Sequence, residues 1–511
     1  MKKIKYSLLT ALAAFMFSCT NLDETLFSQI PSDVFPENDA QIAARLLVIY
    51  DRLPGWPDWA GWFFLQEVTA DAITVPTRAT DWDDDGKWRE LHQHNWTDQT
   101  EALTQAWPEL FRGIMNTNML IDGMAGELDS PEPNPIILRN LAIVKAMRAY
   151  YYYVAIDLYG DVPFITSFVH APALPYRNYR ADIWDSLIRD LEWVVEHLPE
   201  GRGSRAAVNR GMVYSLMAKL FLNAEVFTSR DNGGTADVHG FWASAEYWSN
   251  RVIELGYSLN TDIRGPFLAN NRGCPENIFV VDFDEDLRHG FNLHMRTLHY
   301  DSDQTFGMTL GPWNGFAFQP AFFNTFEETD LRRDAWFLYG PQYTVDGAPL
   351  FDGTTRERVD FFNDIPALIM SAATHGDHVL RNAGVRANKF EVRRGAGQNL
   401  GNQFPIFRLA DIYLMKSEAL IRQGLNGDEW VNRVRARAGV APFSGADLDD
   451  ILAERGRELV WEGHRRQDLI RFGRFGDAWW EKPASGPERE IFFIPRQQVA
   501  ANPNLALPPR R

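Results

Sequence analysis

Helix-forming stretches recur along most of this chain, and they constrain its fold more than any other feature. Within each stretch, apolar side chains return every three or four residues, a spacing that places them on one face of an α-helix. The stretches cover 101–124, 136–159, 181–198, 206–226, 241–255, 409–422, 430–438 and 448–462, with shorter ones near 37–50 and 62–72. The helix lengths and short connectors predict antiparallel pairs stacked as in tetratricopeptide-like solenoids. An irregular all-α domain is the alternative.

The region between the two groups of helices has a different character. Residues 256–407 are rich in Gly, Asn, Asp and aromatic side chains, and only 278–283 reads as a strand. We therefore expect a mainly α fold with little β-structure, in which tetratricopeptide-like helix pairs form a right-handed scaffold that carries an irregular, loop-rich insert. The predicted regions are 37–255 (N-terminal helices), 256–407 (insert) and 408–511 (C-terminal helices).

The first residues have the layout of a secretory signal. Three lysines precede an apolar stretch over 6–17, which Ser18-Cys19 follows. The apolar stretch is shorter than the about 20 residues that a membrane-spanning helix needs, so we interpret 1–18 as a cleaved signal peptide. Cys19 after a small residue predicts lipidation and durable membrane anchoring, with 19–36 as the tether. A signal peptide with a chance cysteine is the alternative.

Charge and cysteine content narrow the class of protein further. The net charge of −17 argues against a nucleic-acid partner and does not favour attraction to an anionic membrane surface. The chain has two cysteines, so acylation of Cys19 would leave no internal disulfide. We expect Cys274 to be a small buried apolar side chain.

A tryptophan-rich segment interrupts the helices between residues 55 and 96. Pro76 and the acidic run 81–86 predict a long loop over 73–97. Flat aromatic rings match the apolar faces of sugars, while carboxylate, amide and guanidinium groups match sugar hydroxyls. Tryptophans that merely fasten the loop to the helices are the alternative.

The residues that we expect to bind a ligand come from this segment and from a second aromatic stretch, 306–326. Trp313 lies there between Pro312 and Asn314-Gly315, a turn that favours exposure. We expect Trp82 and Trp88 to stack on sugar rings, and carboxylates and Arg78 to bind hydroxyls. The full set is Trp56, Asp71, Arg78, Asp81, Trp82, Trp88 and Trp313.

Metal and catalytic chemistry find little support in the sequence. His92-Gln93-His94 lacks a third ligand at a telling spacing, so zinc is not predicted. Calcium could use the oxygens of 83–85, but nothing specifies it, and we predict no cofactor. No common nucleophile, phosphate-loop or metalloprotease motif is present. Glycoside hydrolysis needs only two carboxylates and remains the enzymatic alternative.

A series of motifs follows the signal-like start at Ser18-Cys19. The first spans 107–118, and the most recognisable later segments are 145–163, 408–419, 454–471 and 494–505. In this order they resemble the SusD/RagB family of Bacteroidetes outer-membrane lipoproteins, with Phe111 in place of the family's usual Tyr. Each motif alone is moderately specific, whereas their order on a lipoprotein precursor is strongly specific.

The resemblance implies a nutrient-binding role without turnover. Such a protein would be lipid-anchored at the outer membrane, facing outward, and would deliver an oligosaccharide to a SusC-like TonB-dependent transporter. Some relatives take peptides instead, so a peptide-binding importer component is a further alternative. The family motifs are mostly structural, so they do not identify ligand residues.

Overall fold

The computed structural model describes residues 44–55, 57, 61–228 and 238–510. Contacts group Leu46–Arg511 into one compact unit, which is the unit described below. The predicted signal peptide, the lipidation site Cys19, the tether and Trp56 lie outside the described residues. The regional boundaries within the unit stay predictions.

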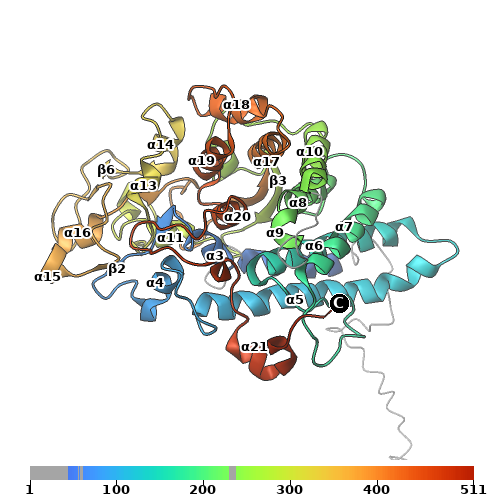
Figure 1. Cartoon of the computed structure of the whole chain (residues 1–511). Helices are drawn as coiled ribbons and strands as arrows, with labels where there is room; N and C mark the ends of the chain where they lie inside the picture. Colours follow the sequence, from blue (N-terminus) through green and yellow to red (C-terminus); the bar gives the residue numbers. More distant parts are fainter. Residues whose placement is uncertain (1–43, 56, 58–60, 229–237, 511) are drawn as a thin grey trace, which may run out of the picture. The chain divides into compact units, whose positions relative to one another are not determined.

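Helices that pack on their sequence neighbours form the scaffold of the unit (Figure 1). α5 contacts α6, α6 contacts α7, α7 contacts α8, and α8 contacts α10; the C-terminal α17 returns to pack on α10 and α8. The helices are α5 (Glu101–Met124), α6 (Pro135–Tyr159), α7 (Arg180–His197), α8 (Arg210–Leu222), α9 (Ala224–Thr228), α10 (Val238–Glu254), α17 (Leu409–Arg422), α18 (Asp428–Arg437), α19 (Leu448–Leu459) and α20 (Arg465–Arg471). This confirms the mainly α fold with tetratricopeptide-like pairs.

Local sequence explains the ends of α6 and its close approach to α5. The Asn134 side chain accepts a hydrogen bond from the backbone N–H of Ile136, and Pro135 occupies the first turn, where its missing N–H costs nothing. Gly160 ends the helix with a φ of 67°. At the crossing, a Cβ on Gly113 would lie 2.7 Å from the ring of Tyr151, so only glycine lets the helices pack this closely.

Two helix predictions differ from the structure near the tryptophan-rich segment. The helix expected over 62–72 is confined to α3 (Phe63–Glu67), because the chain turns before the short strand β1 (Ile73–Thr74). The loop expected over 73–97 contains β2 (Thr77–Arg78) and a further helix, α4 (Lys87–His92). Trp88 and Leu91 bury one side of α4, a pattern too short to predict a helix by itself.

The insert consists of short helices and two-stranded pairings, as expected. β3 (Asn277–Asp282) pairs antiparallel with β10 (Gln403–Arg408) and joins the insert to α17. The other strands are β4 (Ala317–Phe318), β5 (Phe337–Leu338), β6 (Gly340–Pro341), β7 (Asp360–Phe361), β8 (Ile369–Met370) and β9 (Arg386–Ala387). The short helices are α11 (Leu293–Thr297), α12 (Asp303–Phe306), α13 (Pro320–Phe323), α14 (Leu331–Trp336), α15 (Ala372–His375) and α16 (Asp377–Asn382), and α21 (Arg496–Ala501) lies near the C-terminus.

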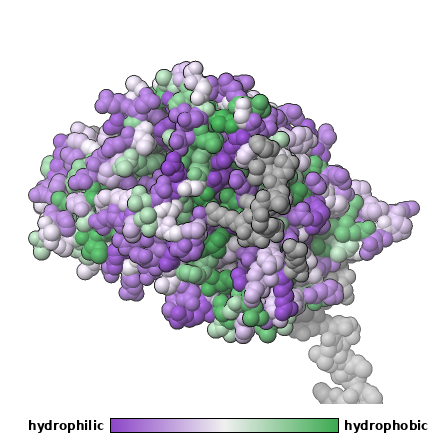
Figure 2. Space-filling model, viewed as in Figure 1, coloured by the Kyte–Doolittle hydropathy of each residue, from purple (hydrophilic) through white to green (hydrophobic). Residues whose placement is uncertain are grey.

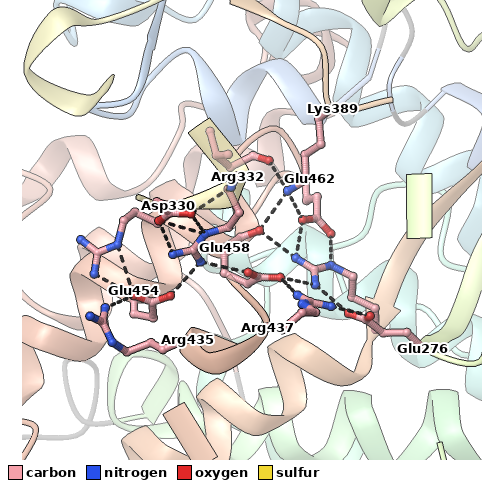
Figure 3. Close-up of polar contacts among 12 residues, drawn as sticks. Glu276, Asp330, Arg332, Lys389, Arg435, Arg437, Glu454, Glu458 and Glu462 are labelled. Carbon is pink, nitrogen blue, oxygen red and sulfur yellow. Dashed lines mark hydrogen bonds and ion pairs between the residues drawn. The ribbon is translucent and has the colours of Figure 1, made fainter. Parts of the chain in front are cut away.

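A buried ion network fastens the insert to the C-terminal helices (Figure 3). Arg408 lies 2.7 Å from Glu458, 2.7 Å from Glu462 and 2.9 Å from Glu276. Arg332 of the insert similarly contacts Glu454 at 2.7 Å. We call the following residues the buried ion network: Glu276, Asp330, Arg332, Lys389, Arg408, Arg435, Arg437, Glu454, Glu458 and Glu462.

The electrostatics of the network depend on complete pairing. Burial alone would raise the pKa of Glu458, but the guanidinium groups of Arg437 and Arg408 outweigh burial and hold this pKa well below its usual value. A buried charge without its partner costs several kcal/mol. The C-terminal charge motifs therefore serve the fold.

The face of the molecule shown in Figure 2 mixes hydrophilic and hydrophobic residues. Among the described residues, no helix has the length and apolar character that crossing a membrane requires. Cys274 is free and buried, as expected.

Candidate functional site

The tryptophan-rich segment and the second aromatic stretch meet through backbone pairing. β1 pairs antiparallel with β4, with Ile73 opposite Phe318. Further along, β2 pairs in parallel with β8 of the insert. The backbone N–H of Trp313 donates to the carbonyl of Met295 at 2.6 Å, which fastens the turn that carries this tryptophan to α11. Segments that are more than 200 residues apart thereby form one surface.

A cavity of about 550 Å³ opens where these segments meet. Three of its lining residues, Asp81, Trp82 and Trp313, belong to the predicted set. Its volume lies within the roughly 300–1,000 Å³ that is usual for small-ligand sites. We call it the Trp82–Trp313 cavity, and it is lined by Asp81, Trp82, Asp84, Asn292, Arg296, Tyr300, Pro312, Trp313 and Gln398.

Trp82 is half-buried and fixed in place by two contacts. Its indole Nε1 donates to the backbone carbonyl of Trp313 at 2.7 Å. Its ring lies so close to Gly315 that a Cβ there would be 2.2 Å from Cε2. Trp82 also has a φ of 61°, an uncommon conformation for a bulky residue. Such conformations concentrate at ligand sites. The ring of Trp82 is therefore fixed in position and only partly covered, so a ligand can reach it.

Trp313 forms another wall of the cavity and is supported from behind by a cation. The Arg296 guanidinium carbon lies 5.5 Å from the centre of the Trp313 ring and 4.7 Å from that of Phe64. Arg296 is only 1% exposed, and its Nε donates to Asn292 Oδ1 at 3.0 Å. These cation–π contacts hold the Trp313 ring, so Arg296 supports the wall while its charge stays largely covered.

Tyr300 and Asp81 supply polar groups at the rim. The Tyr300 hydroxyl donates to Asp81 Oδ2, and the Arg381 guanidinium lies 4.4 Å from the centre of the tyrosine ring. Burial, followed by the Asp81 carboxylate, raises the pKa of Tyr300 to about 12. Tyr300 therefore keeps its proton at neutral pH, while the exposed Asp81 keeps acceptor capacity for a ligand hydroxyl.

The structure corrects the role expected for Trp88. Its side chain is only 3% exposed and packs against Phe64, Trp82 and Phe316. Its Nε1 donates to Asp84 Oδ2 at 2.7 Å. A ring enclosed in this way has no free face for a sugar, so Trp88 supports the neighbouring Trp82.

Asp71 and Arg78 also lie away from the cavity lining. Asp71 forms a two-point ion pair with Arg465, at 2.7 and 2.8 Å. Arg78 is buried and donates to the backbone carbonyls of Leu380 and Ala383, at 2.6 and 3.0 Å; burial lowers the pKa of Arg78 to about 10. Both side chains thus fix the loop and the insert, a role that sequence alone could not separate from ligand binding.

The structure adds lining residues that the sequence did not single out. Asn292, Arg296 and Tyr300 come from a stretch around α11 that is otherwise buried. Gln398 comes from an exposed turn almost 100 residues further along. Only the tertiary fold brings these four residues to the tryptophans, and no local pattern marks them.

One group among the described residues has the composition of a metal site. Ligand atoms of His299, Asp301 and Asp352 lie within 4.8 Å of one another. However, the Arg381 guanidinium contacts Asp352 and lies 3.9 Å from Asp301. A metal ion there would stand against a fixed positive charge, so these groups serve as internal ion-pair partners. The expectation of no cofactor stays a prediction.

The His92 and His94 side chains are held by the fold. His92 Nε2 lies 2.8 Å from the carbonyl of Trp480, and His94 Nε2 lies 2.9 Å from that of Thr69. Burial lowers the pKa of His92 to about 4 and that of His94 to about 3. Both rings are therefore neutral structural groups at pH 7.

Comparison with known proteins relates the chain to one family. Residues 275–503 match the model of the SusD family. The chain is similar to this family over that region. The starch-binding protein SusD of Bacteroides thetaiotaomicron is 24% identical over 77% of this chain and 74% of its own length. SusD-like protein P25 of Formosa agariphila is 25% identical over 80% of this chain and 79% of its own length.

Solved structures show that the SusD fold is shared across nearly the whole chain. A SusD superfamily protein from Parabacteroides distasonis has a TM-score of 0.74 at 21% identity, covering 91% of this chain and 98% of that one. Surface glycan-binding protein A from Bacteroides thetaiotaomicron, in complex with laminarihexaose, has a TM-score of 0.70 at 19% identity, covering 91% and 98%. At these identities the likeness establishes the fold.

Proposed function

We propose that this protein is a member of the SusD family that binds an oligosaccharide in the Trp82–Trp313 cavity and releases it unchanged. The observation that carries this function is the pairing of two half-buried indoles with exposed carboxylates in a cavity of about 550 Å³. Sugar rings have apolar C–H faces that match the indoles, and their hydroxyls would donate to Asp81 and Asp84. Family relatives support the ligand class, since one is a starch-binding protein and another has a bound laminarihexaose.

The N-terminal sequence and the similarity to the SusD family support a proposal for the location and the partner of the protein. We propose that Cys19 carries the lipid anchor and holds the protein on the outer face of the outer membrane. Release of the ligand would then supply a SusC-like TonB-dependent transporter. Co-purification of such a transporter with the full-length protein from native membranes would support this assembly, and recovery of the protein alone from mild detergent would count against it.

Hydrolysis is the competing activity at the same cavity. A glycosidase needs two carboxylates flanking the scissile bond, and Asp81 and Asp84 both line the cavity. Both carboxylates accept hydrogen bonds within the protein, from Tyr300 and Trp88 respectively, and this arrangement favours fixed acceptors for hydroxyls. We expect a bound oligosaccharide to keep its length after prolonged incubation, as judged by chromatography. The appearance of shorter sugars that Asp81→Asn or Asp84→Asn abolishes would establish an enzyme instead.

A glycan array tests the proposed function most economically. We expect the wild-type protein to retain a subset of immobilised oligosaccharides and the Trp82→Ala/Trp313→Ala variant to lose them. Trp193→Ala is the matched control, because Trp193 is a half-buried indole on α7 outside the cavity lining. A blank glycan array together with retention of peptides from a mixed library would favour the peptide-binding alternative.

A further inference from the structure

The ionisable side chains that line the Trp82–Trp313 cavity are unequally placed. Asp81 and Asp84 are exposed at its rim, whereas Arg296, the cation among the lining residues, is 1% exposed. The Arg296 guanidinium lies between the rings of Phe64 and Trp313. An incoming ligand therefore meets two carboxylates before it meets a covered positive charge.

The surroundings of the cavity reinforce this asymmetry. A neighbouring cavity of about 410 Å³ shares Asp84 and is lined also by Asp85, Glu90 and Glu101. Its one lysine, Lys87, lies 2.8 Å from Glu101 and 3.7 Å from Asp84. A chain-like ligand that continues past Asp84 would thus meet further carboxylates, whose nearby cation already has acidic partners.

Cations beside the cavity are likewise engaged with acidic or carbonyl groups. Arg89 pairs with Asp83 at 2.5 Å. Arg381, which lies over Tyr300, contacts Asp352. Arg78 is directed at the backbone carbonyls of Leu380 and Ala383. These contacts leave the exposed carboxylates to dominate the local field.

We propose that the cavity selects uncharged oligosaccharides and excludes glycans that carry carboxylate or sulfate groups, with Asp81 and Asp84 as the specificity-determining residues. This inference rests on the proposed function. The same carboxylates would accept hydrogen bonds from the hydroxyls of neutral sugars and repel an anionic substituent at short range, where screening by water and salt is weakest. Repulsive groups of this kind separate ligands that share the same stacking faces.

Calorimetric titration of the full chain with two sets of ligands, one neutral and one anionic, tests the inference. The neutral set contains gluco-, xylo-, manno- and galacto-oligosaccharides, and the anionic set contains oligogalacturonides, alginate oligomers and sulfated galacto-oligosaccharides. We expect at least one neutral ligand to bind, and every anionic ligand to bind at least tenfold more weakly or not at all. Where weak anionic binding is measurable, 0.5 M NaCl should narrow the gap, because salt screens exposed charges.

Isosteric variants connect the selectivity to the two carboxylates. Asp81→Asn/Asp84→Asn keeps an acceptor for the Tyr300 hydroxyl and the Trp88 indole but removes both charges. We expect this variant to reduce the preference for neutral over anionic ligands by at least threefold. Asp449→Asn is the control, because Asp449 is an exposed carboxylate on α19 outside the cavity lining, and it should leave the preference unchanged.

The outcomes separate this inference from the function on which it rests. An anionic ligand that binds as tightly as the best neutral one would overturn the charge selection while leaving oligosaccharide binding in place. Selectivity that persists in the double Asn variant would overturn the role of Asp81 and Asp84. A folded protein that binds no ligand of either set would overturn the proposed function and this inference together.

Discussion

The buried ion network and the Trp82–Trp313 cavity use charge in opposite ways. In the network, carboxylate and guanidinium groups are almost fully buried and pair with one another between the insert and the C-terminal helical region. At the cavity, Asp81 and Asp84 are exposed, each with one hydrogen bond from a neighbouring aromatic side chain. Charges that are fully paired inside the protein stabilise the fold, whereas exposed carboxylates with remaining acceptor capacity can bind ligands.

The largest effect should come from breaking the network at its centre. Arg408→Met would leave the carboxylates of Glu276, Glu458 and Glu462 without a shared partner. Removal of one member of a buried ion pair costs about 3–5 kcal/mol, and we expect a loss at the upper end of that range or failure to fold. Chemical denaturation would measure it. Arg474→Met, at a half-exposed arginine, is the control and should cost about 0.5 kcal/mol or less. Equal losses of unfolding free energy in Arg408→Met and Arg474→Met would contradict the special role of the buried ion network in stability.

Substitution of Trp88 tests whether the aromatic residues at the cavity also have two separate roles, one in packing and one in ligand binding. Because Trp88 is buried between Phe64, Trp82 and Phe316, Trp88→Ala should lower the free energy of unfolding by about 3–4 kcal/mol, as large-to-small changes in a core do. Thermal and chemical unfolding would measure it. A stable variant with impaired binding alone would restore Trp88 as a ligand residue.

Glu67 is a buried acid close to the buried ion network, and it makes the stability of the protein depend on pH. It belongs to α3, which also carries Phe64 beneath the cavity, and its Oε1 accepts from the backbone N–H of Gly463 at 2.5 Å. Burial raises the pKa of Glu67 to about 7. The folded state therefore favours the protonated acid, and stability falls as pH rises from the usual pKa of the carboxyl to the raised one.

Glu67→Gln isolates this contribution, because glutamine keeps the acceptor and does not titrate. Relative to wild type, we expect the variant to gain about 2–3 kcal/mol of unfolding free energy between pH 5 and pH 8. Denaturation at both pH values would measure the difference, and titration of the buried histidines cancels in the comparison. A difference that stays constant with pH would show that Glu67 is ionised in the fold at pH 5.

Substitution of Trp82 should change the stability of the fold least and the affinity for the ligand most clearly. Trp82→Ala removes a half-buried ring at the cavity, and we expect it to weaken oligosaccharide binding by about 1–3 kcal/mol, the range of an aromatic hot spot. Calorimetric titration would measure affinity, with unfolding followed in parallel. Unchanged affinity would remove Trp82 from the site, and a loss of stability as large as that of Trp88→Ala would erase the distinction between the two tryptophans.

The sequence predicted the scaffold better than the site. The boundaries of α5 and α17 follow directly from apolar spacing, because long amphipathic helices have a strong local signal. Within the tryptophan-rich segment, nothing in the sequence distinguishes the roles of Trp82 and Trp88. Only the packing of Phe64 and Phe316 against Trp88 decides which ring is enclosed.

Two residues that line the cavity, Tyr300 and Arg296, were not predicted from the sequence. Tyr300 and Arg296 lie in a stretch whose neighbours are almost all buried, so local patterns assign them to the core. Their place at the cavity depends on the backbone bonds from Trp313 and Asn314 to the α11 region. Contacts between segments distant in sequence leave no periodic pattern in either segment.

A crystal structure with the oligosaccharide identified on the array would show whether the Trp82–Trp313 cavity is the binding site. We expect a sugar ring in van der Waals contact with the faces of Trp82 and Trp313, and sugar hydroxyls that donate hydrogen bonds to Asp81 or Asp84. A ligand bound elsewhere on the molecule, with the Trp82–Trp313 cavity empty, would contradict this expectation.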